Sequence, residues 1–128
     1  FAVTQEEIDA MKPSLDNLSY TSYMIRVAYD ESEVEVLAAV LSCAYSYEVI
    51  AKKIVANRPE SVDDPFYGDW IRGYASDGYA AGNVMLIETL DRLSAHYTEE
   101  QLRHLEDIFI ACSRYEMVFW QMAWEMRQ

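Results

Sequence analysis

Apolar residues recur at intervals of three and four along almost the whole chain, and this periodicity most narrows the folds that it can adopt. Such spacing puts apolar side chains on one face of an α-helix, whereas strand-like alternation is confined to a few residues around 34–36. Three stretches also match the capping box, in which a hydroxyl and a carboxyl or amide side chain three residues later accept hydrogen bonds from free backbone N–H groups. They are Thr4 with Glu7, Ser32 with Glu35, and Thr98 with Gln101. The sequence therefore predicts an all-α fold.

Prolines and glycines divide this pattern into separate helices. The predicted spans are 5–11, 13–29, 33–55, 66–75 and 99–126. A further helix is predicted between the last two, beginning after a break at Asp77-Gly78 and running to about residue 95. Pro13 suits the first position of a helix, where its missing N–H is not needed. The polar stretch NRPESVDDP, residues 57–65, is predicted to be a loop. Because no repeat or interdomain linker is visible, residues 1–128 are predicted to form a single helical domain.

The charge balance disfavours nucleic acid as a partner. Acidic residues number 22 and basic residues 10, so the formal net charge is -12, and the basic residues are scattered singly apart from Lys52-Lys53. A phosphate backbone would be repelled over most of such a surface. No uninterrupted apolar run approaches the roughly 20 residues of a membrane span, and the start of the chain does not resemble a signal peptide. We therefore expect neither nucleic acid nor a membrane as a partner.

Two cysteines occur, Cys43 and Cys112, and both lie in apolar helical patterns without the dense spacing of a disulfide framework. This favours a reducing compartment, and the cytoplasm is the predicted location. Tyr47 follows Cys43 by four residues, so both side chains lie on the same helix face and can reach one ligand. A free cysteine is often a small buried core residue, and the spacing alone leaves both interpretations of Cys43 open. Cys112 has no aromatic partner at that spacing and is interpreted as core.

Glu116 lies in RYEMVFWQMAW, where large apolar side chains surround the carboxylate. Desolvation there would favour the neutral carboxyl group and suit it to proton transfer. The alternative is a glutamate on the polar stripe of an amphipathic helix, and the sequence alone does not decide between the two. Neither His96 nor His104 follows a glutamate by three residues, as a helical di-iron site requires, so no metal is expected and both histidines are placed on the surface. With no phosphate loop and no GxSxG turn, enzymatic chemistry narrows to cysteine, glutamate and tyrosine.

Four ordered stretches together resemble one known family. They are SLDNLSYTSYM, LAAVLSCAYSYEVIAK, YGDWIRGYASDGY and ACSRYEMVFWQMAW, and they are similar to the TenA family, also called thiaminase II, over nearly the whole chain. The resemblance implies an all-helical fold of the haem oxygenase type, without haem or another cofactor, that usually assembles as a homotetramer. It also implies a hydrolase that cleaves the C–N bond at the methylene of 4-amino-2-methylpyrimidines, including thiamin, and so recovers the pyrimidine.

The same resemblance implies roles for five residues. Cys43 would be the nucleophile, and Glu116 would be the acid/base group that binds the ring nitrogen and the amino group. Tyr47 would stack on or line the pyrimidine, while Tyr20 and Tyr74 would hydrogen-bond near the carboxylate and the thiol respectively. These groups suit the chemistry, because an electron-poor pyrimidine accepts a thiolate when a ring nitrogen gains a proton at the same time.

Two features depart from the family's pattern. Ser42 stands where family members commonly have proline, and the family's fold is longer at its N-terminal side, where helices complete the pocket. We therefore expect this chain to be the C-terminal part of a longer polypeptide, whose missing N-terminal segment covers apolar faces that would otherwise meet water. The alternatives are a helical scaffold or regulatory protein of the same fold without turnover, and a pyrimidine-binding protein without catalysis.

Overall fold

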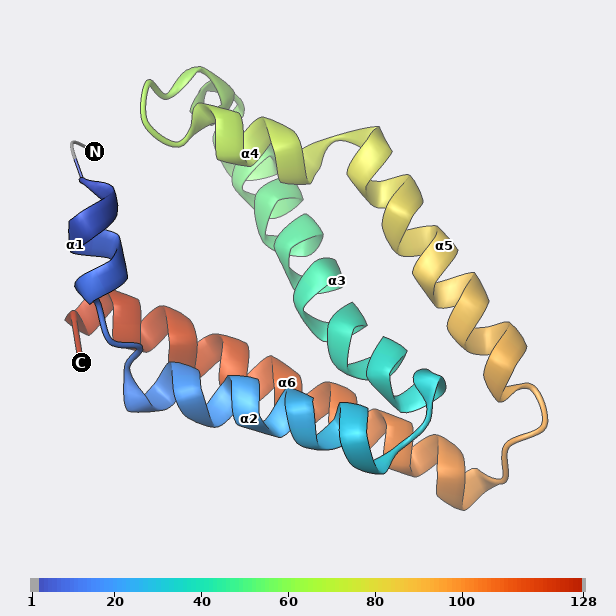
Figure 1. Ribbon diagram of the computed structural model, residues 1–128. Helices are drawn as coiled ribbons and strands as arrows, with labels where there is room; N and C mark the ends of the chain where they lie inside the picture. Colours follow the sequence, from blue (N-terminus) through green and yellow to red (C-terminus); the bar gives the residue numbers. More distant parts are fainter. Residues whose placement is uncertain (1–2, 128) are drawn as a thin grey trace.

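Helices make up the regular structure of residues 3–127, which are the residues that the computed structural model describes, and no strand occurs among them. The elements are α1 (Gln5–Ala10), α2 (Leu15–Asp30), α3 (Glu33–Asn57), the 3₁₀ helix η1 (Pro59–Asp63), α4 (Gly68–Ala75), α5 (Asp77–Ser94) and α6 (Glu99–Glu125). Figure 1 shows α2 and α6 side by side, with α3 and α5 rising away from them and α4 joining the far ends of α3 and α5. The all-α prediction is confirmed.

The three predicted capping boxes are all present. In the first, the backbone N–H of Thr4 donates to Glu7 Oε2 at 2.9 Å, and the N–H of Glu7 donates to Thr4 Oγ1 at 3.2 Å. The boxes at Ser32 and Thr98 begin α3 and α6 in the same way. Each box joins residues only three apart, so it forms without help from the rest of the fold.

Helix boundaries differ from the prediction where a polar side chain caps the chain. The helix predicted from Pro13 begins at Leu15, because the Ser14 hydroxyl accepts the Asn17 N–H at 3.2 Å. Likewise, the break predicted at Asp77-Gly78 lies one residue earlier, where Ser76 caps α5 by accepting the Tyr79 N–H at 3.1 Å. The predicted loop 57–65 contains η1, and α4 begins two residues later than predicted.

Helix α3 is the centre of the fold, since α2, α4, α5 and α6 all contact it. The buried core lies where α2, α3 and α6 meet, and comprises Tyr20, Val27, Val34, Ala38, Ala39, Leu105, Ile108 and Cys112. By length and composition alone, α3 is also apolar enough to cross a membrane, a test that the core helix of a soluble protein passes too. Because four other helices pack on it, we interpret α3 as a core helix.

Candidate active site

Glu116 brings the predicted site residues together. Its side chain projects from α6 and is buried, with 8% of the residue exposed. Cys43 and Tyr47 come from α3, which packs on α6, and Tyr20 comes from α2, which packs on both. After burial itself, the Glu116 carboxylate is the strongest influence on the pKa of Cys43, Tyr20 and Tyr47, and it raises the pKa of all three. Three residues from two other helices, α2 and α3, therefore surround one carboxylate of α6.

Two polar atoms at this place have no hydrogen-bond partner within residues 3–127: the hydroxyl of Tyr20 and Oε2 of Glu116. The Tyr20 ring is firmly held, because it stacks on Tyr115 with centroids 5.3 Å apart and planes inclined by 9°. Buried polar groups in native proteins are nearly always hydrogen-bonded, so each exception needs an explanation. A bound polar ligand would supply the partners that the protein does not.

The Cys43 thiol is half-buried, and its protonation depends on its surroundings. Burial, followed by the neighbouring Glu116 charge, raises the pKa of Cys43 to about 12. The same two causes raise the pKa of Cys112 to about 11. Both cysteines are thus neutral thiols near neutral pH, but Cys112 is fully buried in the core, as predicted. Of the two, Cys43 is the thiol that a ligand can approach.

On the side of Tyr47, the site is bordered by further aromatic rings. Tyr47 contacts Tyr74, Trp70 and Trp120, at centroid distances of 4.9, 5.8 and 5.8 Å. Burial, then Glu116, raises the pKa of Tyr47, so its phenol keeps its proton. Tyr74 therefore joins the site through the Tyr47 ring, and the hydrogen bond expected near the thiol is not among its contacts with the described residues.

Sequence reasoning missed three polar residues next to the site. The Ser42 hydroxyl is fully buried and lies 2.9 Å from the Ser113 hydroxyl on α6. Ser113 itself donates to the carbonyl of Phe109, so Ser42 is the donor between the two hydroxyls. This bond ties α3 to α6 one residue before Cys43, and α3 is unbroken there. The third residue is Asn83, an amide buried on the inward face of α5, whose only sequence signal is a polar residue within an apolar helical run.

No group of three or more histidine, cysteine, aspartate or glutamate residues within 3–127 could hold a metal ion. Both histidines are exposed, as predicted, and His104 Nε2 lies 2.9 Å from Glu31 Oε2. The electrostatics of the candidate site thus come from a carboxylate, a thiol and phenols.

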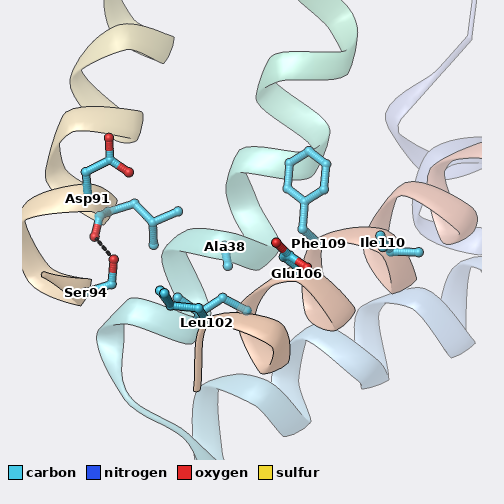
Figure 2. Close-up of a pocket in the computed structure, with 9 residues that line it drawn as sticks. Ala38, Asp91, Ser94, Leu102, Glu106, Phe109 and Ile110 are labelled. Carbon is cyan, nitrogen blue, oxygen red and sulfur yellow. Dashed lines mark hydrogen bonds between the residues drawn. The ribbon is translucent and has the colours of Figure 1, made fainter. Parts of the chain in front are cut away.

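Two of the grooves that residues 3–127 form away from Glu116 are mainly apolar. Figure 2 shows the first, of about 460 Å³, where Ala38 of α3, Ser94 of α5 and Phe109 of α6 line it and the Ser94 hydroxyl donates to the Leu90 carbonyl. The second, of about 510 Å³, is lined by Trp70 and Trp120, and so borders the aromatic rings around Tyr47. Neither is lined by Cys43 or Glu116, and neither brings a nucleophile to a buried acid.

The helical domain thus gathers a thiol, a buried carboxylate and phenols around two polar atoms that have no hydrogen-bond partner among residues 3–127. Residues 1–126 match the TENA/THI-4/PQQC family, and the chain belongs to this family. It is 42% identical to an aminopyrimidine aminohydrolase of Helicobacter pylori, over 96% of this chain and 56% of that protein. It is 40% identical to an aminopyrimidine aminohydrolase of Halalkalibacterium halodurans, over 98% of this chain and 55% of that protein.

Among solved structures, the TenA homologue protein from P. horikoshii OT3 superimposes with a TM-score of 0.77 at 29% identity. The match covers 96% of this chain and 55% of that chain. The predicted TenA resemblance and fold are therefore confirmed. The chain spans about half the length of the curated relatives that it matches.

Proposed function

We propose that the protein is an aminopyrimidine aminohydrolase of the thiaminase II type, which cleaves the C–N bond at the methylene of 4-amino-2-methylpyrimidines. The observation that carries the proposal is the buried Glu116 carboxylate. One of its oxygens has no hydrogen-bond partner among residues 3–127, and the carboxylate lies beside the Cys43 thiol of another helix. The names of the relatives from Helicobacter pylori and Halalkalibacterium halodurans support this activity.

The proton of the Cys43 thiol is central to the mechanism. Burial and Glu116 hold the pKa of Cys43 near 12, so the sulfur atom can attack the ring only as the thiol loses its proton. In this mechanism Glu116 is the base that receives the proton. Glu116 then passes the proton to a ring nitrogen, which neutralises the charge that the addition creates. The amine, which is protonated in the substrate, departs as ammonia when its C–N bond breaks and leaves an exocyclic methylene. Water adds to the methylene carbon, and expulsion of sulfur restores the ring. Of the two protons then released, one from the added water and one from the ring nitrogen, one returns to sulfur to restore the thiol and the other leaves with the ammonia as ammonium.

The aromatic residues have binding roles in this proposal. The flat face of Tyr47 stacks on the pyrimidine, since offset aromatic pairs are favourable and its ring is fixed by Trp70 and Trp120. Tyr20 uses its unpartnered hydroxyl near the carboxylate, and Tyr74 supports Tyr47 from the side facing α4. Neither a metal nor a cofactor has a role in these steps.

Large apolar side chains remain exposed on α2 and α6, among them Leu15 at 77%, Tyr29 at 86%, Met117 at 65% and Trp124 at 87%. Removing such surface from water is favourable by about 25 cal/mol per Å². We propose that these faces are covered in the working enzyme, both by polypeptide that corresponds to the rest of the relatives and by further subunits of a cytoplasmic homotetramer. Light scattering on the purified full-length protein tests the assembly, and a monomer at micromolar concentration would contradict it.

The activity is tested by measuring ammonia release from 4-amino-5-aminomethyl-2-methylpyrimidine by the full-length protein, with its formylated precursor and thiamin assayed in parallel by pyrimidine product. We expect turnover of at least one of the three, with hydroxymethyl pyrimidine as the common product. Binding of the pyrimidine without turnover would instead favour a binding protein, and neither binding nor turnover would favour the scaffold or regulatory alternative.

Replacing Tyr20 with phenylalanine should lower activity without lowering stability. The ring would keep its stacking on Tyr115, and the lost hydroxyl has no partner within the described residues, so the free energy of unfolding should stay the same or rise. We expect kcat/KM to fall by roughly ten- to a hundredfold, because the hydroxyl that would hydrogen-bond the bound pyrimidine beside the carboxylate is lost. Urea denaturation and steady-state kinetics on the same samples check this. A destabilised variant with normal kcat/KM would contradict it.

A further inference from the structure

Helix α5 binds one backbone carbonyl of α3 with two side chains. The Tyr79 hydroxyl donates to the carbonyl oxygen of Ala44 at 3.0 Å, and Asn83 Nδ2 donates to the same oxygen at 3.2 Å. Asn83 Nδ2 also donates to Glu48 Oε2 at 2.6 Å, so both of its N–H bonds are used on α3. Asn83 is 3% exposed. We name Tyr79, Asn83, Ala44 and Glu48 the α5 clamp.

The clamp lies directly beside the predicted catalytic residues. Ala44 follows Cys43, and Glu48 follows Tyr47, so the clamped pair and the catalytic pair each span the same turn of α3. Successive residues of an α-helix are about 100° apart around its axis. The catalytic pair faces Glu116 on α6 while the clamped pair faces α5, and any rotation of α3 moves both pairs together.

Apolar packing alone does not require this arrangement. A buried amide has to replace the hydrogen bonds that it made with water in the unfolded chain. Asn83 replaces them with bonds to a backbone carbonyl and to a carboxylate, which belong to residues one helical turn apart. Glu48 is held in turn by Lys52 Nζ at 2.6 Å. One amide bound at both ends of a turn fixes the helix against rotation and against sliding, whereas apolar side chains tolerate small shifts.

We propose that Asn83, assisted by Tyr79, is a positioning residue that sets the rotation of α3 and thereby aims Cys43 and Tyr47 at Glu116. This inference rests on the proposed function of Cys43. A misplacement of reacting atoms by about 1 Å can lower a rate by a hundredfold. Loss of the clamp should therefore lower kcat more than it alters KM.

The test compares Tyr79→Phe and Asn83→Ala in the full-length protein, under conditions where circular dichroism shows both to be folded. Tyr79→Phe keeps the ring that contacts Tyr74 at 4.9 Å and removes one hydroxyl, so it is the milder change. We expect kcat to fall by about tenfold in Tyr79→Phe and by about a hundredfold in Asn83→Ala. Ser94→Ala is the matched control, because Ser94 is a buried polar residue of α5 whose hydroxyl donates to the Leu90 carbonyl of the same helix. It should keep the parent's kcat.

Thiol labelling distinguishes a change in the position of Cys43 from a general loss of packing in the protein. Iodoacetamide labelling of Cys43 and Cys112 is followed by mass spectrometry between pH 7 and 9. Moving Cys43 away from the Glu116 charge should speed its labelling relative to Cys112, and this effect should disappear when Asn83→Ala is combined with Glu116→Gln. Equal acceleration of both cysteines, or an unchanged kcat in folded Asn83→Ala, would overturn the inference.

The same data distinguish failure of the inference from failure of the proposed function. If the parent shows no turnover of the pyrimidine, the proposed function fails. If Cys43→Ser turns over like the parent, Cys43 is not the nucleophile and the proposed mechanism fails, whatever the clamp variants do. If Cys43→Ser is inactive while the clamp variants keep the parent's kcat and labelling ratio, only the positioning role fails.

Discussion

Replacing Cys43 with serine should lower pyrimidine turnover by about 10⁴-fold or more, because the variant loses the atom that bonds to the substrate. A serine hydroxyl is a far weaker nucleophile than a thiol, and Glu116 is the only base placed to activate it in the proposed mechanism. Substrate binding should change little, since stacking on Tyr47 and the contact with the carboxylate remain. The measurement is kcat by ammonia release, together with the Kd of the pyrimidine by calorimetry.

Cys112→Ala is the matched control for this variant. Cys112 is the other thiol near Glu116, but it is fully buried in the core and should not touch the substrate. We expect Cys112→Ala to keep kcat within a few-fold of the parent while lowering stability modestly, because a buried side chain is shortened. Loss of activity in Cys112→Ala with retention in Cys43→Ser would reverse the assignment of the nucleophile.

Replacing Glu116 with glutamine should have two opposite effects. Turnover should fall by roughly 10²- to 10⁴-fold, because the amide can neither accept the thiol proton nor deliver it to the ring. Labelling of Cys43 by iodoacetamide at pH 8 should become roughly tenfold faster, because the negative charge that helps to raise the pKa of Cys43 is gone. Circular dichroism must show that Glu116→Gln is folded, because unfolding would also expose the thiol and speed its labelling.

The raised pKa of Cys43 also determines how the labelling rate of this thiol depends on pH. The thiolate is the reactive form, so below the pKa of about 12 the labelling rate of Cys43 in the parent should rise about tenfold per pH unit, with no plateau between pH 7 and 10. In Glu116→Gln the pKa of Cys43 is lower, and the curve should bend at a lower pH. Glu106→Gln, an exposed glutamate on the same helix, is the control and should leave the curve unchanged. A parent plateau below pH 9 would contradict the raised pKa.

The sequence predicted the helices well because their signals are local. Thr4 with Glu7 and Thr98 with Gln101 form their caps within three residues, and the structure contains both. The errors lie where neighbouring residues could each start a helix. Ser14, and not Pro13, sets the start of α2 by capping it, and Ser76 caps α5 one residue before the break predicted at Asp77. The four motifs, taken in order, also identified the family correctly.

The candidate site was predictable only through that resemblance. From its own spacing, Cys43 could be a core residue, and Glu116 could lie on a polar stripe. Burial of Glu116 at 8% exposure decides the second question, since a residue on a solvated stripe would be exposed. The roles of Cys43, Glu116, Tyr20, Tyr47 and Tyr74 in catalysis stay predictions until the variants are measured.

Local sequence therefore determined where the helices begin, which faces are apolar and that Cys43 and Tyr47 share a face. Only the tertiary structure decided that this face meets Glu116, that Ser42 binds Ser113 across 71 residues of sequence, and that Asn83 holds α3 from α5. The physical reason is that caps and helical periodicity depend on neighbours within one or two turns. The rotation of one packed helix against another depends on side chains from both, which no local pattern records.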